Sequence, residues 1–162
     1  MKKVDYLIII STESPEGQEV TKDDIITQHT TSKTQGGWGW NRPGIDYLVT
    51  LDGTLQTIIP EESPTTVDLW GIRAGKQGIN GIPKFLAYAG GKTTQGVNPK
   101  DTRTEDQKNT LAAVVNFYVR KFPEIQVMGF NQVPAKKGIP NPAFNVAKWC
   151  ESIGIPEENI WK

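Results

Sequence analysis

The residues best suited to catalysis are scarce in this chain of 162 residues, which contains a single histidine, His29, and a single cysteine, Cys150. A catalytic zinc ion needs about three protein ligands from histidine, cysteine or carboxylate, with one position left for water. His29 lies in the middle of an expected helix, and Cys150 lies in the last expected helix. We therefore expect a histidine ring that is satisfied within the fold and a thiol that behaves as a small core hydrophobe. The alternative for each is a catalytic role.

Other catalytic arrangements find little support in the sequence. A Ser-His-Asp triad would have to use His29, and no Gly-x-Ser-x-Gly turn is present to expose a nucleophile. The glycines of "GGWGW" and "AGG" do not have the spacing of a phosphate-binding or dinucleotide-binding loop. Two carboxylates are sufficient to cleave a glycoside, so an acid pair remains open. Nothing in the spacing of the 18 acidic residues selects such a pair.

Composition excludes several classes of partner. The formal net charge is zero, so no basic field favours nucleic acid or an anionic membrane surface. No apolar run approaches the ~20 residues that a membrane span needs. The start, "MKKVDYLIIISTESPEG", has a short apolar run without the longer region and cleavage site of a signal peptide. We expect synthesis in the cytoplasm, which a single cysteine also fits; a protein released by lysis or carried in a phage particle would share these features.

The elements that must position any site form an α/β pattern. A β-branched apolar run at Val4–Ile10 predicts a central strand, and two β-rich runs around Asp52-Gly53 predict a hairpin. Thr21 is a good N-cap for the first helix, and Thr104 with Gln107 resembles a capping box for the longest one. Further strands are expected at 84–91 and 124–130, and a final helix at 145–154 with Gly154 as its stop. The order predicts one domain, residues 1–162, with a mixed sheet flanked by helices.

Several segments in this order resemble a known family. They are "LIIISTESPEGQEVTKDDIITQHT", "GGWGWNRPGIDYLVTLDGTL", "GINGIPKFLAYAGG", "PKDTRTEDQKNTL" and "GFNQV" followed by "NPAFNVAKW". Together they are similar to the type 2 N-acetylmuramoyl-L-alanine amidases, which are related to peptidoglycan recognition proteins. The similarity is greatest to the subgroup common in Bacteroidales and their phages, and it covers nearly the whole chain. It implies the same mixed sheet with helices on its faces.

Active members of that family hold zinc with two histidines and a cysteine, and the matching positions of this chain carry other residues. The first histidine follows two isoleucines in the family pattern, where this chain has Ile10. The second follows a glycine, where this chain has Phe130 after Gly129. The cysteine opens a C-P-S-F-D pattern, where this chain has Asn141; Gly138 is an alternative, because the preceding loop is longer by about three residues. The resemblance thus implies a lost zinc site, with no metal and no cofactor.

Two helper residues of the family are also in doubt. A tyrosine that often assists catalysis follows a glycine before the hairpin, and this chain has Ile45 after Gly44. A lysine near the cysteine helps to stabilise the oxyanion, and Lys136 or Lys137 falls in that region. Without zinc, hydrolysis of an amide has no evident attacking group. We therefore expect Ile10 and Phe130 to meet in a dry, filled centre with Asn141 at its edge.

The resemblance implies a catalytically inactive homologue that binds a peptidoglycan fragment or a protein partner, for example in a phage particle or a secretion apparatus. Aromatic faces and an arginine suit sugar rings and peptide carboxylates, so Trp38, Trp40, Trp70 and Arg73 are the expected binding residues, with Lys136 beside them. The alternative for the tryptophans is packing of the glycine-rich loop onto the core. The alternative function is an active peptidoglycan hydrolase with a non-standard site.

Overall fold

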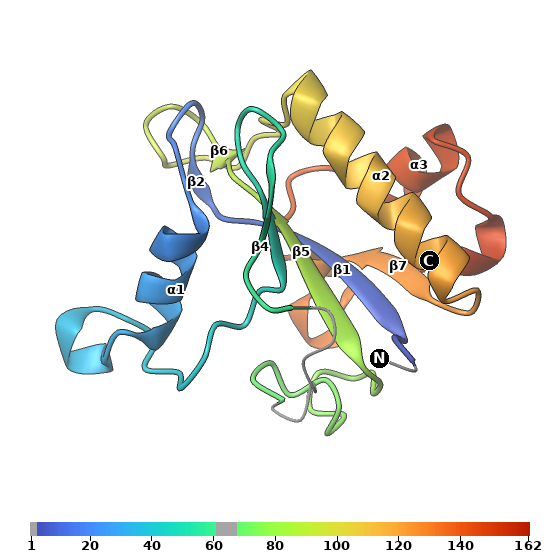
Figure 1. Ribbon diagram of the computed structural model, residues 1–162, viewed down its shortest axis with the longest axis horizontal. Helices are drawn as coiled ribbons and strands as arrows, with labels where there is room; N and C mark the ends of the chain where they lie inside the picture. Colours follow the sequence, from blue (N-terminus) through green and yellow to red (C-terminus); the bar gives the residue numbers. More distant parts are fainter. Residues whose placement is uncertain (1–2, 61–67) are drawn as a thin grey trace.

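The computed structural model describes residues 3–60 and 68–162 and has a five-stranded mixed sheet with helices on both faces (Figure 1). The strands lie in the order β4-β3-β5-β1-β7, and every neighbouring pair is parallel except β3 with β4. Their bounds are β1 Tyr6–Ser11, β3 Tyr47–Val49, β4 Leu55–Thr57, β5 Pro83–Tyr88 and β7 Gln126–Gly129. The predicted fold class and the Asp52-Gly53 hairpin are confirmed.

A second, smaller sheet was not predicted. It pairs β2 (Ser14–Pro15) with β6 (Gly91–Lys92) in parallel, although the first segment reads as a polar loop. Strands of two residues are too short to show an alternating pattern. Their pairing depends on a partner that is distant in the sequence, so local reasoning could not find it.

The helices begin where the capping residues predict. Helix α1 is Lys22–Thr30 and α2 is Glu105–Lys121; the final helix α3 is Val146–Ser152. The Thr21 N–H donates to the Asp24 carboxylate at 2.8 Å, and the capping box of Thr104 with Gln107 is present. Gly154 follows α3 with a φ of +80°, which confirms it as the stop. Short 3₁₀ helices are η1 Lys33–Gln35, η2 Phe130–Gln132, η3 Pro134–Lys136 and η4 Glu157–Asn159.

The strand expected at 124–130 begins two residues too early and ends one residue too late. β7 ends at Gly129, and Phe130 begins η2. The Gln132 carboxamide accepts a hydrogen bond from the Gly129 N–H at 2.9 Å, which turns the chain into a 3₁₀ helix. Residues 61–67 lie outside the described part of the chain, and residues 68–81 contain turns without helix or strand.

Side chains alternate between the two faces of the sheet and build a core on each. On the face covered by α2 and α3, here called the α2 face, the core includes Ile9, Val49, Leu86, Tyr118 and Cys150. On the opposite face, here called the α1 face, it includes Ile8, Ile10, Ile25, Phe85 and Phe130. Two of the residues expected at the zinc site, Ile10 and Phe130, therefore belong to the α1 face.

Candidate functional site

Ile10 and Phe130 lie in the same buried apolar cluster. Ile10 is the second-last residue of β1, and Phe130 begins η2. Less than a tenth of the surface of either residue is exposed. The Trp70 ring packs edge-on against Phe130, with ring centroids 5.4 Å apart. These contacts are those of a packed hydrophobic core, and neither side chain carries an atom that could bind a metal ion.

Asn141 lies against the end of β1 and makes a pair of buried hydrogen bonds with one residue. Its Oδ1 accepts from the Ser11 N–H at 2.7 Å, and its Nδ2 donates to the Ser11 carbonyl at 3.2 Å. The pairing of β1 with β7 stops at Ile9 and Gly129, so the side-chain amide continues it at Ser11. The alternative residue, Gly138, is exposed in the loop. Thus Asn141 closes the sheet at the position where the family resemblance expects a zinc ligand.

The histidine and the cysteine lie on opposite faces of the sheet. Cys150 is fully buried in the α2-face core, where burial raises the pKa of its thiol to about 12. Burial of the His29 ring lowers its pKa to about 4, so the ring is neutral near pH 7. Within residues 3–60 and 68–162, no three side chains of His, Cys, Asp or Glu lie close enough together to hold a metal ion.

His29 is enclosed by tryptophans from the glycine-rich loop. Its Nδ1 accepts a hydrogen bond from the Gly44 N–H at 3.0 Å, which places the ring proton of the neutral form on Nε2. The Trp38 ring stacks on it at 4.1 Å between centroids, and the Trp40 ring meets it edge-on at 5.2 Å. The ring is satisfied within the fold, as expected.

The tryptophans combine packing with exposure. The Trp70 indole N–H donates to the Gly44 carbonyl at 2.7 Å, and its ring stacks on Phe85 at 4.8 Å. A Cβ on Gly44 would meet the Trp40 ring at 2.4 Å, so glycine is required for this close approach. Trp38 is 39% exposed, and Trp40 and Trp70 are partly buried. We call these three residues the tryptophan cluster; it packs the loop and also offers aromatic surface.

The predicted cationic residues lie near this cluster. Arg73 is exposed and lines a small cavity of about 40 Å³ with Trp70 and Arg42. The Lys136 ammonium lies 5.8 Å from the centroid of the Phe130 ring, within the range of a cation–π contact. Lys137, the other lysine considered, is exposed. The structure therefore brings Trp70, Phe130 and Lys136 into one neighbourhood, and Arg73 shares the small cavity with Trp70.

A buried ion pair escaped the sequence analysis. The Lys84 ammonium lies 3.2 Å from the Asp46 carboxylate, and the Lys84 side chain has no exposed surface. Burial raises the pKa of the Asp46 carboxyl, and the nearby ammonium opposes that rise. The carboxylate also accepts from the Phe85 N–H at 2.7 Å, which ties the start of β5 to β3. A lysine inside the apolar run "KFLAYA" was the available signal.

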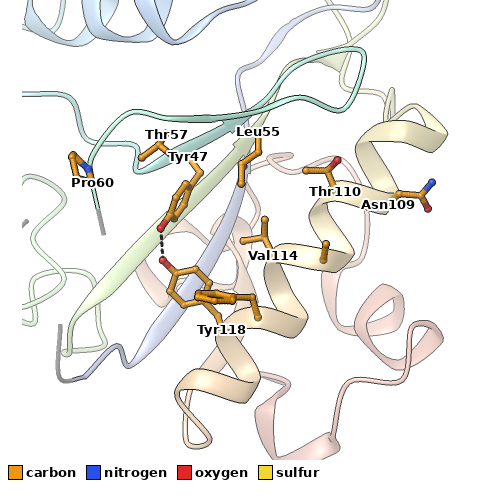
Figure 2. A pocket seen from close by; sticks show the side chains of 10 residues that line it. Tyr47, Leu55, Thr57, Pro60, Asn109, Thr110, Val114 and Tyr118 are labelled. Atoms are coloured by element: carbon orange, nitrogen blue, oxygen red, sulfur yellow. Dashed lines mark hydrogen bonds between the residues drawn. The ribbon is translucent and has the colours of Figure 1, made fainter. Parts of the chain in front are cut away.

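The α2 face carries a separate groove of about 720 Å³ between β4 and α2 (Figure 2). Figure 2 shows the Tyr47 and Tyr118 side chains meeting within it, where their hydroxyls are 2.7 Å apart. Exposed Leu55 and Phe117 lie on its walls. None of the residues predicted from the sequence to bind a ligand lines this groove.

No helix among the described residues is long and apolar enough to cross a membrane. No protein-family model matches the chain, and no curated protein matches it. Relationship to known proteins therefore depends on comparison of three-dimensional structures.

Solved structures do match over nearly the whole chain. The endolysin of the Thermus scotoductus bacteriophage Ph2119 superposes with a TM-score of 0.60 at 19% identity, covering 93% of this chain and 85% of that one. The ectodomain complex of peptidoglycan recognition proteins LCa and LCx bound to tracheal cytotoxin gives 0.62 at 18% identity, covering 98% and 84%. The amidase endolysin LysCS from Clostridium intestinale gives 0.63 at 15% identity, covering 94% and 85%. The chain therefore has the fold of the type 2 amidases and peptidoglycan recognition proteins.

Proposed function

We propose that this chain is a non-catalytic relative of the peptidoglycan amidases that binds peptidoglycan fragments. The observation that carries the proposal is the arrangement of Ile10, Phe130 and Asn141, which offers two hydrocarbon side chains and one neutral amide. Zinc makes water a nucleophile near neutral pH by lowering its pKa. A site of this composition supplies neither a metal ligand set nor a general base.

The remaining candidates for catalysis are committed elsewhere. His29 accepts a backbone hydrogen bond and stacks on Trp38, and Cys150 is buried beneath the opposite face of the sheet. Ile45, where the family often has tyrosine, is buried and apolar. A hydrolase of this chain would need a relocated acid pair, which is the alternative function. The measurement of zinc content and sacculus cleavage described below tests this alternative as well.

Ligand binding is assigned to the tryptophan cluster with Arg73 and Lys136. Trp38 exposes more than a third of its surface, enough for a sugar ring to stack on it. Arg73 is exposed at the edge of Trp70, where its guanidinium can meet a carboxylate in a bidentate geometry. A structural neighbour supports this choice of ligand, because it is a complex of tracheal cytotoxin with peptidoglycan recognition proteins LCa and LCx.

A second candidate function is contact with a protein partner, for example in a phage particle or a secretion apparatus. It is favoured by Phe130, which is buried and packs against Trp70. The tryptophans also pack on one another, with the Trp40 and Trp70 centroids 5.2 Å apart, so part of their surface serves the fold. In this version the aromatic surface would recognise a protein rather than a glycan.

Two measurements on the purified chain separate these functions. The first is zinc content, paired with release of stem peptides from purified sacculi; we expect neither stoichiometric zinc nor release. Zinc at one equivalent with released peptide would overturn the non-catalytic proposal, and release of glycan fragments without zinc would identify the acid-pair hydrolase.

The second measurement is retention on insoluble peptidoglycan at low salt. We expect retention by the natural sequence and a loss of at least about tenfold in affinity for Trp38→Ala. Phe117→Ala is the matched control, because Phe117 is an aromatic residue, 50% exposed, on the opposite face of the sheet. Absence of retention would favour the protein-contact function.

Restoring the family ligands tests the assignment of the lost zinc site. We expect the triple variant Ile10→His, Phe130→His and Asn141→Cys to bind zinc, because the family resemblance assigns these three positions to one zinc site. We expect no release of stem peptides, because Ile45 leaves the helper position without a tyrosine. A triple variant that folds but binds no zinc would show that these positions were aligned wrongly.

A further inference from the structure

We infer that a groove beside α1 binds an uncharged saccharide, and the inference rests on the proposed function for identifying that saccharide as the glycan of peptidoglycan. The groove has a volume of about 500 Å³ and is distinct from the tryptophan cluster. One wall is the side of α1 that includes Thr27 and Gln28. The other walls are the chain that follows β1, from Thr12 to Val20, and the turn of η1 at Gln35.

The chemistry of the lining selects an uncharged, hydroxyl-rich ligand. Hydroxyl groups come from serine and threonine, carboxamides come from Gln18, Gln28 and Gln35, and carboxylates come from Glu19 and Asp24. No lysine or arginine is among the described residues that line the groove, so it does not suit a phosphate or a nucleic acid. Sugar hydroxyls can donate to the carboxylates, and they can both donate to and accept from the carboxamides.

Several of these polar groups are available to a ligand. The side chains of Gln18, Thr27 and Gln35 are exposed and make no hydrogen bond to another described residue. The Gln28 amide donates only at 3.4 Å to the Gly36 carbonyl. Binding would therefore exchange water for ligand at these groups without breaking bonds that hold the fold together.

The groove also has an apolar floor and fixed walls. Val20 and Ile25 are buried at its base and can meet the C–H face of a sugar ring. The Thr12 and Ser14 hydroxyls both accept from the Gly90 N–H at 3.0 Å, which fixes the wall after β1. A Cβ on Gly37 would lie 2.1 Å from the Thr31 carbonyl, so glycine allows η1 to pack closely against the end of α1. Such pre-organisation reduces the cost of binding.

The tryptophan cluster continues from this groove along the chain. Trp38 follows Gly37 directly, and its backbone N–H donates to the Gln28 carbonyl at 2.9 Å. A muropeptide could then place its glycan in the groove and its stem peptide toward Trp70 and Arg73. The two parts of the proposed ligand thus have separate binding residues.

The test uses chitotetraose, a tetramer of N-acetylglucosamine that has no stem peptide, and follows binding by NMR chemical shifts and titration calorimetry. We expect shifts at residues 27–37 and weakening of about fivefold to tenfold for the double variant Gln28→Ala with Gln35→Ala. Thr27→Arg, which fills the groove from an exposed helix position, is expected to abolish binding. Thr34→Ala is the matched control, because Thr34 is an exposed residue of η1 that does not line the groove.

Each outcome distinguishes this inference from the proposed function. Retention on sacculi, without chitotetraose binding and without an effect of the groove variants, would overturn the groove and leave the proposed function standing. If the chain binds chitotetraose and the groove variants weaken this binding, the groove is supported even where the chain is not retained on sacculi. Failure of both sacculi and chitotetraose to bind would overturn both.

Discussion

The two faces of the sheet are built in different ways. The α2 face is covered by two regular helices, whose apolar stripes meet the alternate side chains of the strands. The α1 face is covered by one short helix, turns and a glycine-rich loop that carries the tryptophan cluster. Both faces contain aromatic pairs, but only the α1 face carries the tryptophan cluster, its close approach to Gly44 and the residues proposed to bind a ligand.

The difference fits the proposal that the framework of the fold is kept while the zinc site is replaced. Regular helices and strands on the α2 face hold the ends of β1 and β7 in place. On the α1 face the same strand ends carry Ile10 and lead into Phe130, which pack as core residues. The proposed loss of metal donors at these strand ends would therefore require no change in topology.

The largest expected effect tests the buried ion pair next to the α2-face core. Lys84→Met leaves the Asp46 carboxylate buried without its partner, so we expect a loss of about 3–5 kcal/mol in the free energy of unfolding. Urea denaturation measures it. Lys92→Met is the control, because Lys92 lies 3.9 Å from Glu13 in a partly exposed pair and should cost less than about 1 kcal/mol. Equal losses for the two variants would contradict the importance of the buried pair.

The next effect tests the closure of the sheet at the candidate site. Asn141→Ala removes both partners of the buried Ser11 backbone groups, and we expect a loss of about 2–3 kcal/mol. Thermal unfolding and urea denaturation should agree on this loss. Asn145→Ala is the matched control, because it removes an exposed N-cap bond to the Lys148 N–H, worth about 1 kcal/mol. A smaller loss at 141 than at 145 would show that the amide bridge is dispensable.

The third effect is a pH dependence that arises on the α1 face. The folded-state pKa of His29 is lowered to about 4 from 6.5, so protonation favours the unfolded chain. Stability from this group is complete above pH 6.5, falls as the pH drops toward 4, and then levels off. We expect a loss of about 2 kcal/mol over that window, after allowance for partial solvent screening.

Urea denaturation at several pH values measures this loss. His29→Asn is the control, because its amide oxygen can still accept from the Gly44 N–H but does not titrate in this range. The variant should therefore show a flatter stability profile between pH 6.5 and 4. An unchanged profile would assign the pH dependence to other groups.

The smallest expected effect concerns Trp38. Because 39% of its surface is exposed and its ring stacks on His29 at the edge of the tryptophan cluster, we expect Trp38→Ala to cost about 1 kcal/mol or less. The same variant should lose binding to sacculi, which separates a ligand-binding role from a structural one. A loss of several kcal/mol would indicate that Trp38 serves mainly to pack the loop.

The contrast between the faces also explains what the sequence could predict. Capping residues such as Thr104 and Gln107 act within a few residues of each other, so the helix starts were found from local patterns. The Asp52-Gly53 hairpin has the same local character. The candidate site was located by resemblance, which identified Ile10 and Phe130 as strand-end positions. Caps and tight hairpins can be predicted without knowing which distant segments pack against them.

Interactions between distant segments were not predictable in the same way. Three interactions illustrate this: the β2–β6 pairing, the Lys84–Asp46 pair and the bridge from Asn141 to Ser11. Each joins residues that are at least 38 positions apart, and β2 and β6 are also too short to recognise. The family resemblance aligned Asn141 with a cysteine ligand, but it could not indicate which backbone groups the amide satisfies. That information exists only in the folded arrangement.

The bridge from Asn141 has a consequence for how the chain folds in different surroundings. Its two hydrogen bonds are between neutral groups, so they require neither a cation nor the loss of a proton from a side chain. A metal ligand at this point would couple folding to metal supply and to pH. The amide joins the end of β1 to the segment before α3 with the same stability whether metal ions are abundant or scarce. A chelator should therefore not weaken this junction.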